Sequence, residues 1–424
     1  MSRSRGVLGS DPYDARAGGP RRRDDGPVVG GTGLPIAPVV AVVGLIVAAV
    51  VTLSLASGRL PFGVGSPNGG GPNVAQTHTP SNQVVVPDDP RAHVPGTIVY
   101  AKDGNVWLQS GAAATELTTG GADGMPSLSA DGQTVYFIRT RQQHGLWPPG
   151  AAAKPYLLTI PSVMRIPVAG GTPDKLLDGI IDPAGSAVWT SWIREPAVSP
   201  DGSTIAVISD LAQPSGAGLV LQLLNVATGK LTNLGLSEER PLGHQDPAWR
   251  PDGKVLLYVR NARDDLNGIP QIYAWNPATK TAKAFSGIGY LQPAYSRDGR
   301  WLAATKSSAL GSDIVILDGV TGAEVLRVTN DGNAWAPVWS PKGDSVAFLH
   351  VNGQVVDLRL VMLEGSGPSW TLGDALDLTS GAGLDSLSRP GWFIPADQLP
   401  APTAQPTAAP SGSTGAGSPT PSPS

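Results

Sequence analysis

Four aspartates recur at matching places along the chain, and carboxylates are side chains that bind hard cations or act as general acids and bases. Each stands directly before a glycine, and the four are Asp131, Asp201, Asp252 and Asp298. An Asp-Gly pair is also a turn signal, because aspartate accepts a backbone N–H two residues on and glycine takes a positive φ. Each aspartate lies in its own turn, so we expect four separate turns and no shared metal or acid–base site.

The other side chains that carry chemistry form no recognisable motif. The sequence has no cysteine, which excludes disulfides, thiolate metal sites and a cysteine nucleophile. It has no Gly-x-Ser-x-Gly pentapeptide of the kind that serine hydrolases use. The histidines are scattered, without an HxxxH or HExxH pair, and are His78, His93, His144, His244 and His350. We therefore predict no catalytic residue, no bound metal and no cofactor.

The aspartates belong to a longer repeat whose copies each begin at a proline. The copies begin at Pro126, Pro196, Pro247, Pro293 and Pro337, so successive spacings are 70, 51, 46 and 44 residues. In each copy a short strand leads into the turn, and an apolar run such as TIAVI or SVAFL follows. Two more strands complete the copy, for example IPQIYAWN and TAKAFSG after Pro247. Four strands in about 45 residues are typical of one propeller blade.

Two fragments at the ends of the repeat region complement each other. Residues 97–119 contain three strand-like runs without a proline-initiated first strand, whereas Arg389 to Phe393 look like that first strand alone. Joined in one sheet, they make a sixth blade and remove the free sheet edges. We predict an all-β, six-bladed propeller closed by the N- and C-terminal strands. Six blades are favoured over seven because the long first gap holds an insertion, 141–158, with no second Asp-Gly pair.

The repeat pattern, Pro-x-Trp/Tyr/Val-Ser-Pro-Asp-Gly followed by an apolar strand, resembles the TolB-type, WD40-like propeller repeat. The resemblance covers residues from about 97 to 395, and the sequence departs from the pattern at Ala130, Arg297 and Lys342. It implies the propeller fold and a protein partner in the cell envelope. TolB proteins carry a further domain before the propeller, and here a linker and an apolar segment take that place.

The segment 36–56 has 21 residues without a charge, enough for a helix of about 30 Å that spans a bilayer. Arginines precede it at Arg21 to Arg23, and only Arg59 follows closely, so the positive-inside rule places the N-terminus in the cytoplasm. A cleaved signal peptide ending at Ala56 is the alternative. The predicted order is a disordered cytoplasmic arm (1–35), a transmembrane helix (36–56), a flexible linker (57–93), the propeller (94–395) and a disordered Pro/Ser/Thr tail (396–424).

The residue before each blade-opening proline is predicted to lie near one end of the central channel. The six are Met125, Glu195, Asp246, Gln292, Ala336 and Arg389. Structural positions repeat, whereas this set is mixed, which favours a binding mouth. Glu195 and Asp246, in adjacent blades opposite Arg389, could grip a peptide or a small cationic ligand. Aromatic contacts could come from Trp192, His244 and Trp335. Solvated loop residues without a ligand are the alternative.

These patterns predict a membrane-anchored bacterial propeller outside the cytoplasm, which binds an envelope protein or peptide and performs no catalysis. The net charge of −4 leaves no electrostatic footprint for nucleic acid. Two alternatives remain, a propeller hydrolase or lyase with a carboxylate site at the channel mouth, and a glycan or small-ligand sensor. The insertion 141–158, which contains Trp147, is a second candidate surface, or else a loop packed over its own blade.

Overall fold

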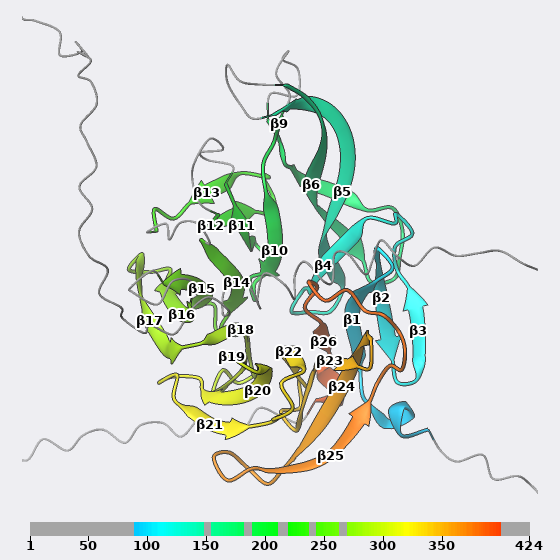
Figure 1. Cartoon of the computed structure of the whole chain (residues 1–424), viewed down its shortest axis with the longest axis vertical. Coiled ribbons are helices and arrows are strands. Elements are labelled where there is room, and N and C mark those ends of the chain that lie inside the picture. The colour runs from blue at the N-terminus through cyan, green and yellow to red at the C-terminus, as the bar shows by residue number, and fades with distance from the viewer. Residues whose placement is uncertain are drawn as a thin grey trace, which may run out of the picture. The chain divides into compact units, whose positions relative to one another are not determined.

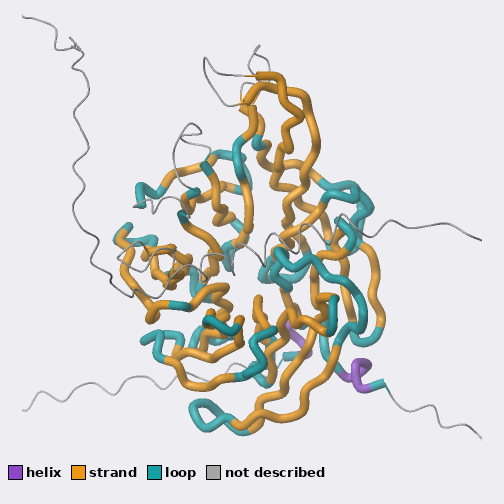
Figure 2. Tube along the Cα trace, viewed as in Figure 1, coloured by secondary structure: helices purple, strands orange, loops and turns teal. Residues whose placement is uncertain are grey.

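The computed structural model describes residues 89–147, 154–181, 189–210, 219–236, 243–262 and 269–399. These residues form six four-stranded antiparallel sheets around a central axis (Figure 1). Figure 2 shows that loops join the strands almost without helix. The predicted all-β, six-bladed propeller is therefore confirmed.

No helix in the described part of the chain is long and apolar enough to cross a membrane. The predicted cytoplasmic arm (1–35) and transmembrane helix (36–56) lie outside the described residues, as do most of the linker (57–93) and of the tail (396–424). The membrane anchor therefore remains a prediction from the sequence.

Each of the first three blades runs from an innermost strand at the channel to an outermost strand. Blade 1 comprises β4 (Asp123–Leu128), β5 (Thr134–Trp147), β6 (Lys154–Pro167) and β7 (Asp174–Asp178). Blade 2 comprises β10 (Ile193–Val198), β11 (Thr204–Ser209), β12 (Val220–Asn225) and β13 (Leu231–Asn233). Blade 3 comprises β14 (His244–Trp249), β15 (Leu256–Ala262), β16 (Ile269–Asn276) and β17 (Thr281–Ile288).

The remaining blades follow the same order, and the last one takes its strands from both ends of the chain. Blade 4 comprises β18 (Tyr290–Tyr295), β19 (Trp301–Ser308), β20 (Gly311–Asp318) and β21 (Glu324–Arg327). Blade 5 comprises β22 (Ala334–Trp339), β23 (Ser345–Asn352), β24 (Val355–Glu364) and β25 (Thr371–Asp377). Blade 6 comprises β26 (Gly391–Phe393), β1 (Thr97–Lys102), β2 (Asn105–Ser110) and β3 (Ala113–Glu116).

The turn after each innermost strand is built as the repeat predicts. In blade 1, Asp131 Oδ1 accepts the backbone N–H of Gln133 at 3.0 Å, and Gly132 has a φ of 68°. The same bond to the residue two positions on is made, at 3.0 to 3.1 Å, by Asp201, Asp252 and Asp298. Each aspartate thus serves the turn of its own blade, and the predicted separation of the four is confirmed.

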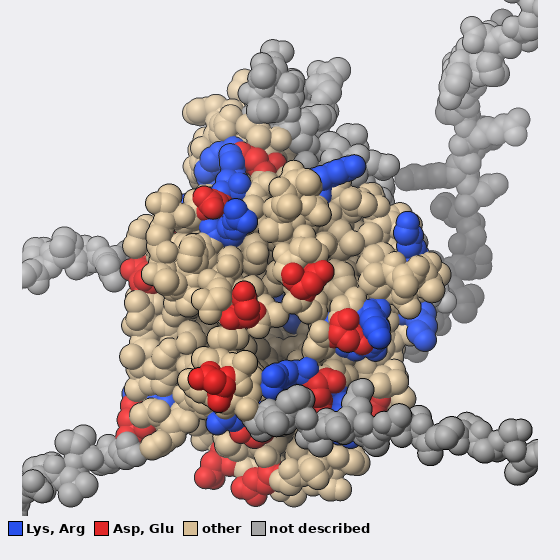
Figure 3. Space-filling view, turned by 180° about the vertical axis from the view of Figure 1, so that it is seen from behind, with Lys and Arg blue, Asp and Glu red and all other residues tan. Residues whose placement is uncertain are grey.

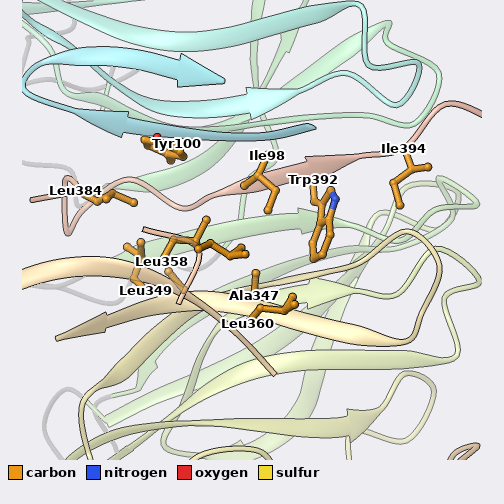
Figure 4. Packing of buried hydrophobic residues seen from close by; sticks show 11 residues of the cluster. Ile98, Tyr100, Ala347, Leu349, Leu358, Leu360, Leu384, Trp392 and Ile394 are labelled. Carbon is orange, nitrogen blue, oxygen red and sulfur yellow. The ribbon is translucent and has the colours of Figure 1, made fainter. Parts of the chain in front are cut away.

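The two ends of the repeat region meet in blade 6, as predicted. β26 pairs with β1, so that Trp392 lies opposite Ile98 and Phe393 lies opposite Thr97. Figure 4 shows Trp392 and Ile98 packed against Ala347 and its neighbours in blade 5. Closure therefore buries apolar surface between two blades in addition to pairing the backbone, and both terms stabilise the ring.

Short segments on both sides of the propeller also fold onto it. A 3₁₀ helix, η1 (Pro90–His93), precedes β1, and a second one, η2 (Ala396–Gln398), follows β26. Trp392 Nε1 donates to the carbonyl oxygen of Pro95 at 2.9 Å, and Leu399 packs against the core between blades 5 and 6. The folded region thus extends a few residues into the predicted linker and tail.

The insertion lengthens blade 1 instead of adding a blade. β5 and β6 pair over their whole lengths and form a long hairpin that projects from the propeller (Figure 1). The alternative of a loop packed over its own blade is therefore wrong, because residues 141–147 and 154–158 continue the strand pairing. Tyr156 and Leu157 are exposed on this hairpin. A small sheet of β8 (Ile180–Ile181) and β9 (Trp189–Thr190) follows blade 1 in the chain.

Candidate functional site

The residues before the blade-opening prolines share an uncommon backbone conformation. Met125, Glu195, Asp246, Gln292 and Ala336 all have a positive φ, between 51° and 54°. At each of them the pairing of the innermost strand with its neighbour shifts register, as in a β-bulge. Such a conformation costs about 1–3 kcal/mol for a residue other than glycine and persists only where the surroundings fix it.

Side chains from the preceding blade hold these strained residues in place. The N–H of Asp246 donates to Glu195 Oε2 at 2.6 Å, and the N–H of Gln292 donates to Asp246 Oδ2 at 3.1 Å. The N–H of Ala336 donates to Gln292 Oε1 at 2.9 Å. Each side chain thus binds the backbone of the next blade at the equivalent position. We call this set, with Met125 and Ser388, the pre-proline ring.

Hydrogen bonds of the pre-proline ring connect neighbouring blades at every seam, or boundary between two blades, except the one between blades 5 and 6. Ser388 Oγ accepts the N–H of Met125 at 2.7 Å, and Met125 Sδ accepts the N–H of Glu195 at 3.4 Å. Together with the three bonds above, these contacts cross five of the six seams between blades. Ala336 has no polar side chain for the sixth seam, between blades 5 and 6. Trp392 fills that seam with apolar contacts.

Arg389 reaches across the channel from the end that closes the propeller. Its guanidinium donates to the carbonyl oxygen of Pro247 at 3.4 Å and to that of Pro293. These prolines lie in the innermost strands of blades 3 and 4, on the other side of the channel. Hydrogen bonds from a charged donor are stronger than neutral ones, so Arg389 ties the closing segment to two distant blades.

The pre-proline ring and the adjacent Arg389 together hold buried charges of both signs. Asp246 is only 6% exposed, and burial together with the neighbouring Glu195 carboxylate raises the pKa of Asp246 to about 7. Arg389 acts on that pKa in the opposite direction, and burial lowers the pKa of Arg389 itself. Glu195 also accepts hydrogen bonds from the guanidinium of Arg194. The charge of Asp246 therefore changes near neutral pH.

The structure brings four of the predicted site residues together, since Glu195, Asp246, Gln292 and Arg389 meet through these bonds and charges. The three predicted aromatic contacts lie in different surroundings. His244 is buried, and its Nδ1 accepts the N–H of Leu221 at 3.1 Å. Trp335 Nε1 donates to the carbonyl oxygen of Ser386 at 3.0 Å. Trp192 is 60% exposed, so it is the one aromatic of the three that is open to a partner.

A cavity of about 420 Å³ occupies the channel. Its lining runs from Met125, Glu195 and Arg389 in or beside the pre-proline ring to the turns that follow the innermost strands. Its aromatic wall residues are Trp249, Tyr295, Trp339, Trp392 and Phe393. Figure 3 shows a hollow at the centre of one face, with acidic side chains in separate patches around it. The cavity is thus apolar along its walls and charged at its inner end.

Sequence reasoning missed the rim of this cavity. The second residue of the turn lines the cavity in five blades, and these residues are Ala130, Pro200, Pro251, Arg297 and Pro341. The signal was present in the sequence, because Ala130 and Arg297 depart from the proline of the repeat. Arg297 is exposed and places a cation among apolar rim residues.

This arrangement is suited to holding a ligand. Ligand sites are typically concave, largely apolar and about 300–1,000 Å³ in volume, with a few polar groups that fix orientation. The aromatic walls, the prolines and the charged inner end match that description. In the described ranges, no three His, Asp or Glu side chains gather in a way that could hold a metal ion.

Six four-stranded blades and a shared closing sheet define a six-bladed β-propeller, and the Pro-to-Asp-Gly repeat that builds it resembles the TolB-type repeat. No family model matches the chain. An uncharacterized protein of Agrobacterium fabrum is 27% identical over 305 residues, which cover 67% of this chain and 94% of that protein.

Two similar solved structures are described as TolB proteins. The first, from Acinetobacter baumannii, is 17% identical with a TM-score of 0.49 and matches 70% of this chain. The chain spans 66% of the length of that protein. The second, from Agrobacterium tumefaciens, is 18% identical with a TM-score of 0.47, and the match covers 72% of this chain and 95% of that one. Likenesses at this level concern the fold alone.

Proposed function

We propose that the chain is a non-catalytic binding module that takes a peptide, or an extended segment of another protein, in its central cavity. The observation that carries this proposal is the lining of the cavity, which combines proline and aromatic walls with Arg389 and Glu195 at its inner end. Aromatic side chains supply most of the binding energy at such sites, and charged groups set orientation. An extended chain is the partner shape that a narrow channel admits.

The pre-proline ring supports this role by keeping the cavity rigid. Its hydrogen bonds cross five seams between blades, so the innermost strands that line the cavity are fixed before any ligand arrives. A preorganised site avoids the cost of ordering its own side chains on binding. Affinity then depends on the fit of the ligand to the walls and on its contacts at the rim.

We further propose that the module works at a bacterial cell envelope, outside the cytoplasm. The uncharged segment 36–56, with arginines before it, supports an anchored N-terminus. The linker 57–93 would then give the propeller a reach of about 30–35 Å from the membrane by coil statistics. An envelope protein or peptide within that reach is the partner we propose.

A hydrolase or lyase is the rival proposal. A carboxyl group with a pKa of about 7 beside a second carboxylate, as at Asp246 and Glu195, suits acid–base catalysis. The pre-proline ring favours a structural reading of this pair, however. Gln292 and Ser388 make the same bond to the next blade with side chains that do not titrate at ordinary pH. We therefore favour binding over catalysis.

Selection of random displayed peptides against the immobilised full chain tests the proposal. Selected peptides should lose at least about tenfold in affinity, or about 1.4 kcal/mol, for the rim variants Pro200→Glu and Arg297→Glu. The rim position tolerates other side chains, since Ala130 occupies it in blade 1. The matched control is Lys283→Glu, which makes the same charge change as Arg297→Glu at an exposed site on the outermost strand of blade 3. It should bind like the wild type.

Equal affinity for the wild type and all three variants would remove the cavity as the binding site. Binding of an arrayed glycan that is lost in the two rim variants, with no peptide selected, would support the sensor alternative. Turnover of a substrate that is lost in Asp246→Asn, without a loss of thermal stability, would support the hydrolase or lyase alternative.

A further inference from the structure

The described part of the chain ends at the cavity. Leu399, its last residue, lines the cavity together with Ile394 and with Phe393 of the closing strand. η2 turns the chain at this point, where the N–H of Leu399 donates to the carbonyl oxygen of Ala396 at 3.3 Å. The following segment, residues 400–424, therefore starts within the cavity lining itself.

The composition of residues 400–424 matches the cavity walls. The segment has no charged side chain and seven prolines, and its other residues are Ala, Ser, Thr, Gly and Gln. Proline-rich sequences favour the extended polyproline II conformation, which docks into aromatic-lined grooves at a low cost in entropy. The cavity offers Trp249, Tyr295 and Trp339 on its walls and prolines at its rim. Prolines also bring no N–H groups, so few donors would be buried without partners.

We propose that the first residues of the segment 400–424, which directly follow Leu399, bind in the central cavity of their own chain and that an external partner must displace them. The displacement rests on the proposed function, whereas the docking itself does not. The proposal replaces the solvated, disordered tail that composition alone predicts, because composition does not show where the tail is attached.

Attachment at Leu399 makes even a weak contact effective. A segment joined to its site by a short connection has an effective concentration in the millimolar range. If the free peptide binds with a dissociation constant of about 1 mM, the attached segment would occupy the cavity about half of the time. A partner with micromolar affinity would still displace the segment, so the tail would set a threshold for binding without blocking it.

The cysteine-free chain allows a direct test in the full-length protein. A bimane fluorophore on Thr403→Cys should be quenched by contact with tryptophan in the cavity. We expect its emission to be about twofold or more below that of the same label on Ala309→Cys, an exposed turn residue, as half-occupancy implies. An excess of synthetic peptide 400–412 should restore the emission. The paired substitutions Trp249→Phe and Trp339→Phe should raise the emission in part, because Trp392 remains in the lining.

A label as bright as the Ala309→Cys control would overturn the proposal, as would quenching that survives both added peptide and the paired tryptophan substitutions. Thermal unfolding shows whether the tryptophan variant is folded, and if it is not, the added peptide alone decides. The test needs no external partner. A failed peptide selection would therefore count against the proposed function but not against docking of the tail. A bright label would count against docking of the tail but not against peptide binding.

Discussion

Aspartates in two regions of the propeller have pKa values that are shifted in opposite directions. In the turns, side-chain hydrogen bonds from the residue two positions earlier lower the pKa of Asp131, Asp201 and Asp252. In the pre-proline ring, burial and the nearby Glu195 carboxylate raise the pKa of Asp246 to about 7. Both kinds of carboxylate accept a backbone N–H, so the difference comes from exposure to water and from neighbouring charge.

The two regions also differ in what their side chains hold. A turn aspartate binds within its own blade, so the same residue can serve in any copy, and it recurs in four of the five copies. A ring residue binds the backbone of the next blade, so it adapts to a neighbour that differs each time. Variation along the pre-proline ring therefore reflects contacts between blades, and variation by itself does not identify a binding site.

The largest loss in the free energy of unfolding is expected from substituting Arg389, whose cation lies beside the buried carboxylates of the pre-proline ring. Arg389→Met leaves Glu195 and Asp246 without this buried cation and leaves the carbonyl oxygens of Pro247 and Pro293 without their charged donor. A buried charge left without a compensating charge of opposite sign costs about 3–5 kcal/mol. Urea unfolding of the full-length variant should show a loss of that size.

The matched control for Arg389→Met is Arg165→Met. Arg165 lies 3.5 Å from Asp174 with both side chains well exposed, at 41% and 69%, so its loss should cost less than about 1 kcal/mol. Asp246→Asn in the Arg389→Met background should recover part of the lost stability, because it removes one uncompensated carboxylate. Equal losses for the two arginine variants would show that the buried charges are not coupled.

The second effect is the pH dependence caused by Asp246. Its pKa rises from an ordinary 3.8 to about 7 on folding, so the folded state holds the proton more tightly. The free energy of unfolding should therefore fall as the pH rises from about 4 to about 7, and stay level above that range. Asp246→Asn keeps an oxygen for the N–H of Gln292 and removes this slope. The variant should be more stable than the wild type at pH 8, by about 1 kcal/mol or more.

At pH 4 the difference between Asp246→Asn and the wild type should nearly vanish, because the buried carboxyl is then neutral in the folded state. Thermal unfolding midpoints at the two pH values measure both quantities. A constant difference from pH 4 to pH 8 would mean that Asp246 ionises normally, and the contrast with the turn aspartates would disappear.

The sequence predicted the fold well because the repeat consists of local signals. Proline, Asp-Gly and an apolar run each act within a few residues, and five copies agree on the strand pattern. The closing blade was also predictable, since Trp392 and Phe393 have strand character but no following turn of their own. The course of the 141–158 insertion was not, because these residues carry no copy of the repeat signal, although β5 and β6 are consecutive strands of one hairpin.

The candidate site was less predictable for a related reason. The positive φ of Asp246 and the bond that fixes it depend on Glu195, which lies 51 residues earlier in the chain. His244 looked available near the channel mouth, yet it is buried, and its Nδ1 accepts the N–H of Leu221. Arg297 stood out only as a departure from the repeat, and its place on the rim appears when the blades are arranged around the channel.

A smaller effect is expected in the turns. Asp201→Ala removes acceptors for the N–H of Ser203 and the hydroxyl of Ser199, which should cost about 1 kcal/mol at neutral pH. The pKa of Asp201 is lowered by folding, chiefly through Ser199, so this contribution should be lost as the pH falls below about 4. The contribution of Asp201 to the free energy of unfolding thus grows as the pH rises, whereas that of Asp246 falls. Unfolding midpoints at pH 7 and pH 3 compare the two regions directly.

In the turn of the fifth copy an aspartate can be introduced instead of removed, and this substitution is expected to change the stability least. Lys342 stands where the other copies have aspartate, and its turn is held by the N–H of Lys342 on Ser340 Oγ at 3.2 Å. Lys342→Asp can add an acceptor for the N–H two residues on, at Asp344, and should stabilise the full chain by less than about 1 kcal/mol. Repulsion from the Asp344 carboxylate limits the gain, and added salt should increase it. A loss of stability at high salt would show that the turn aspartates act through something other than this local bond.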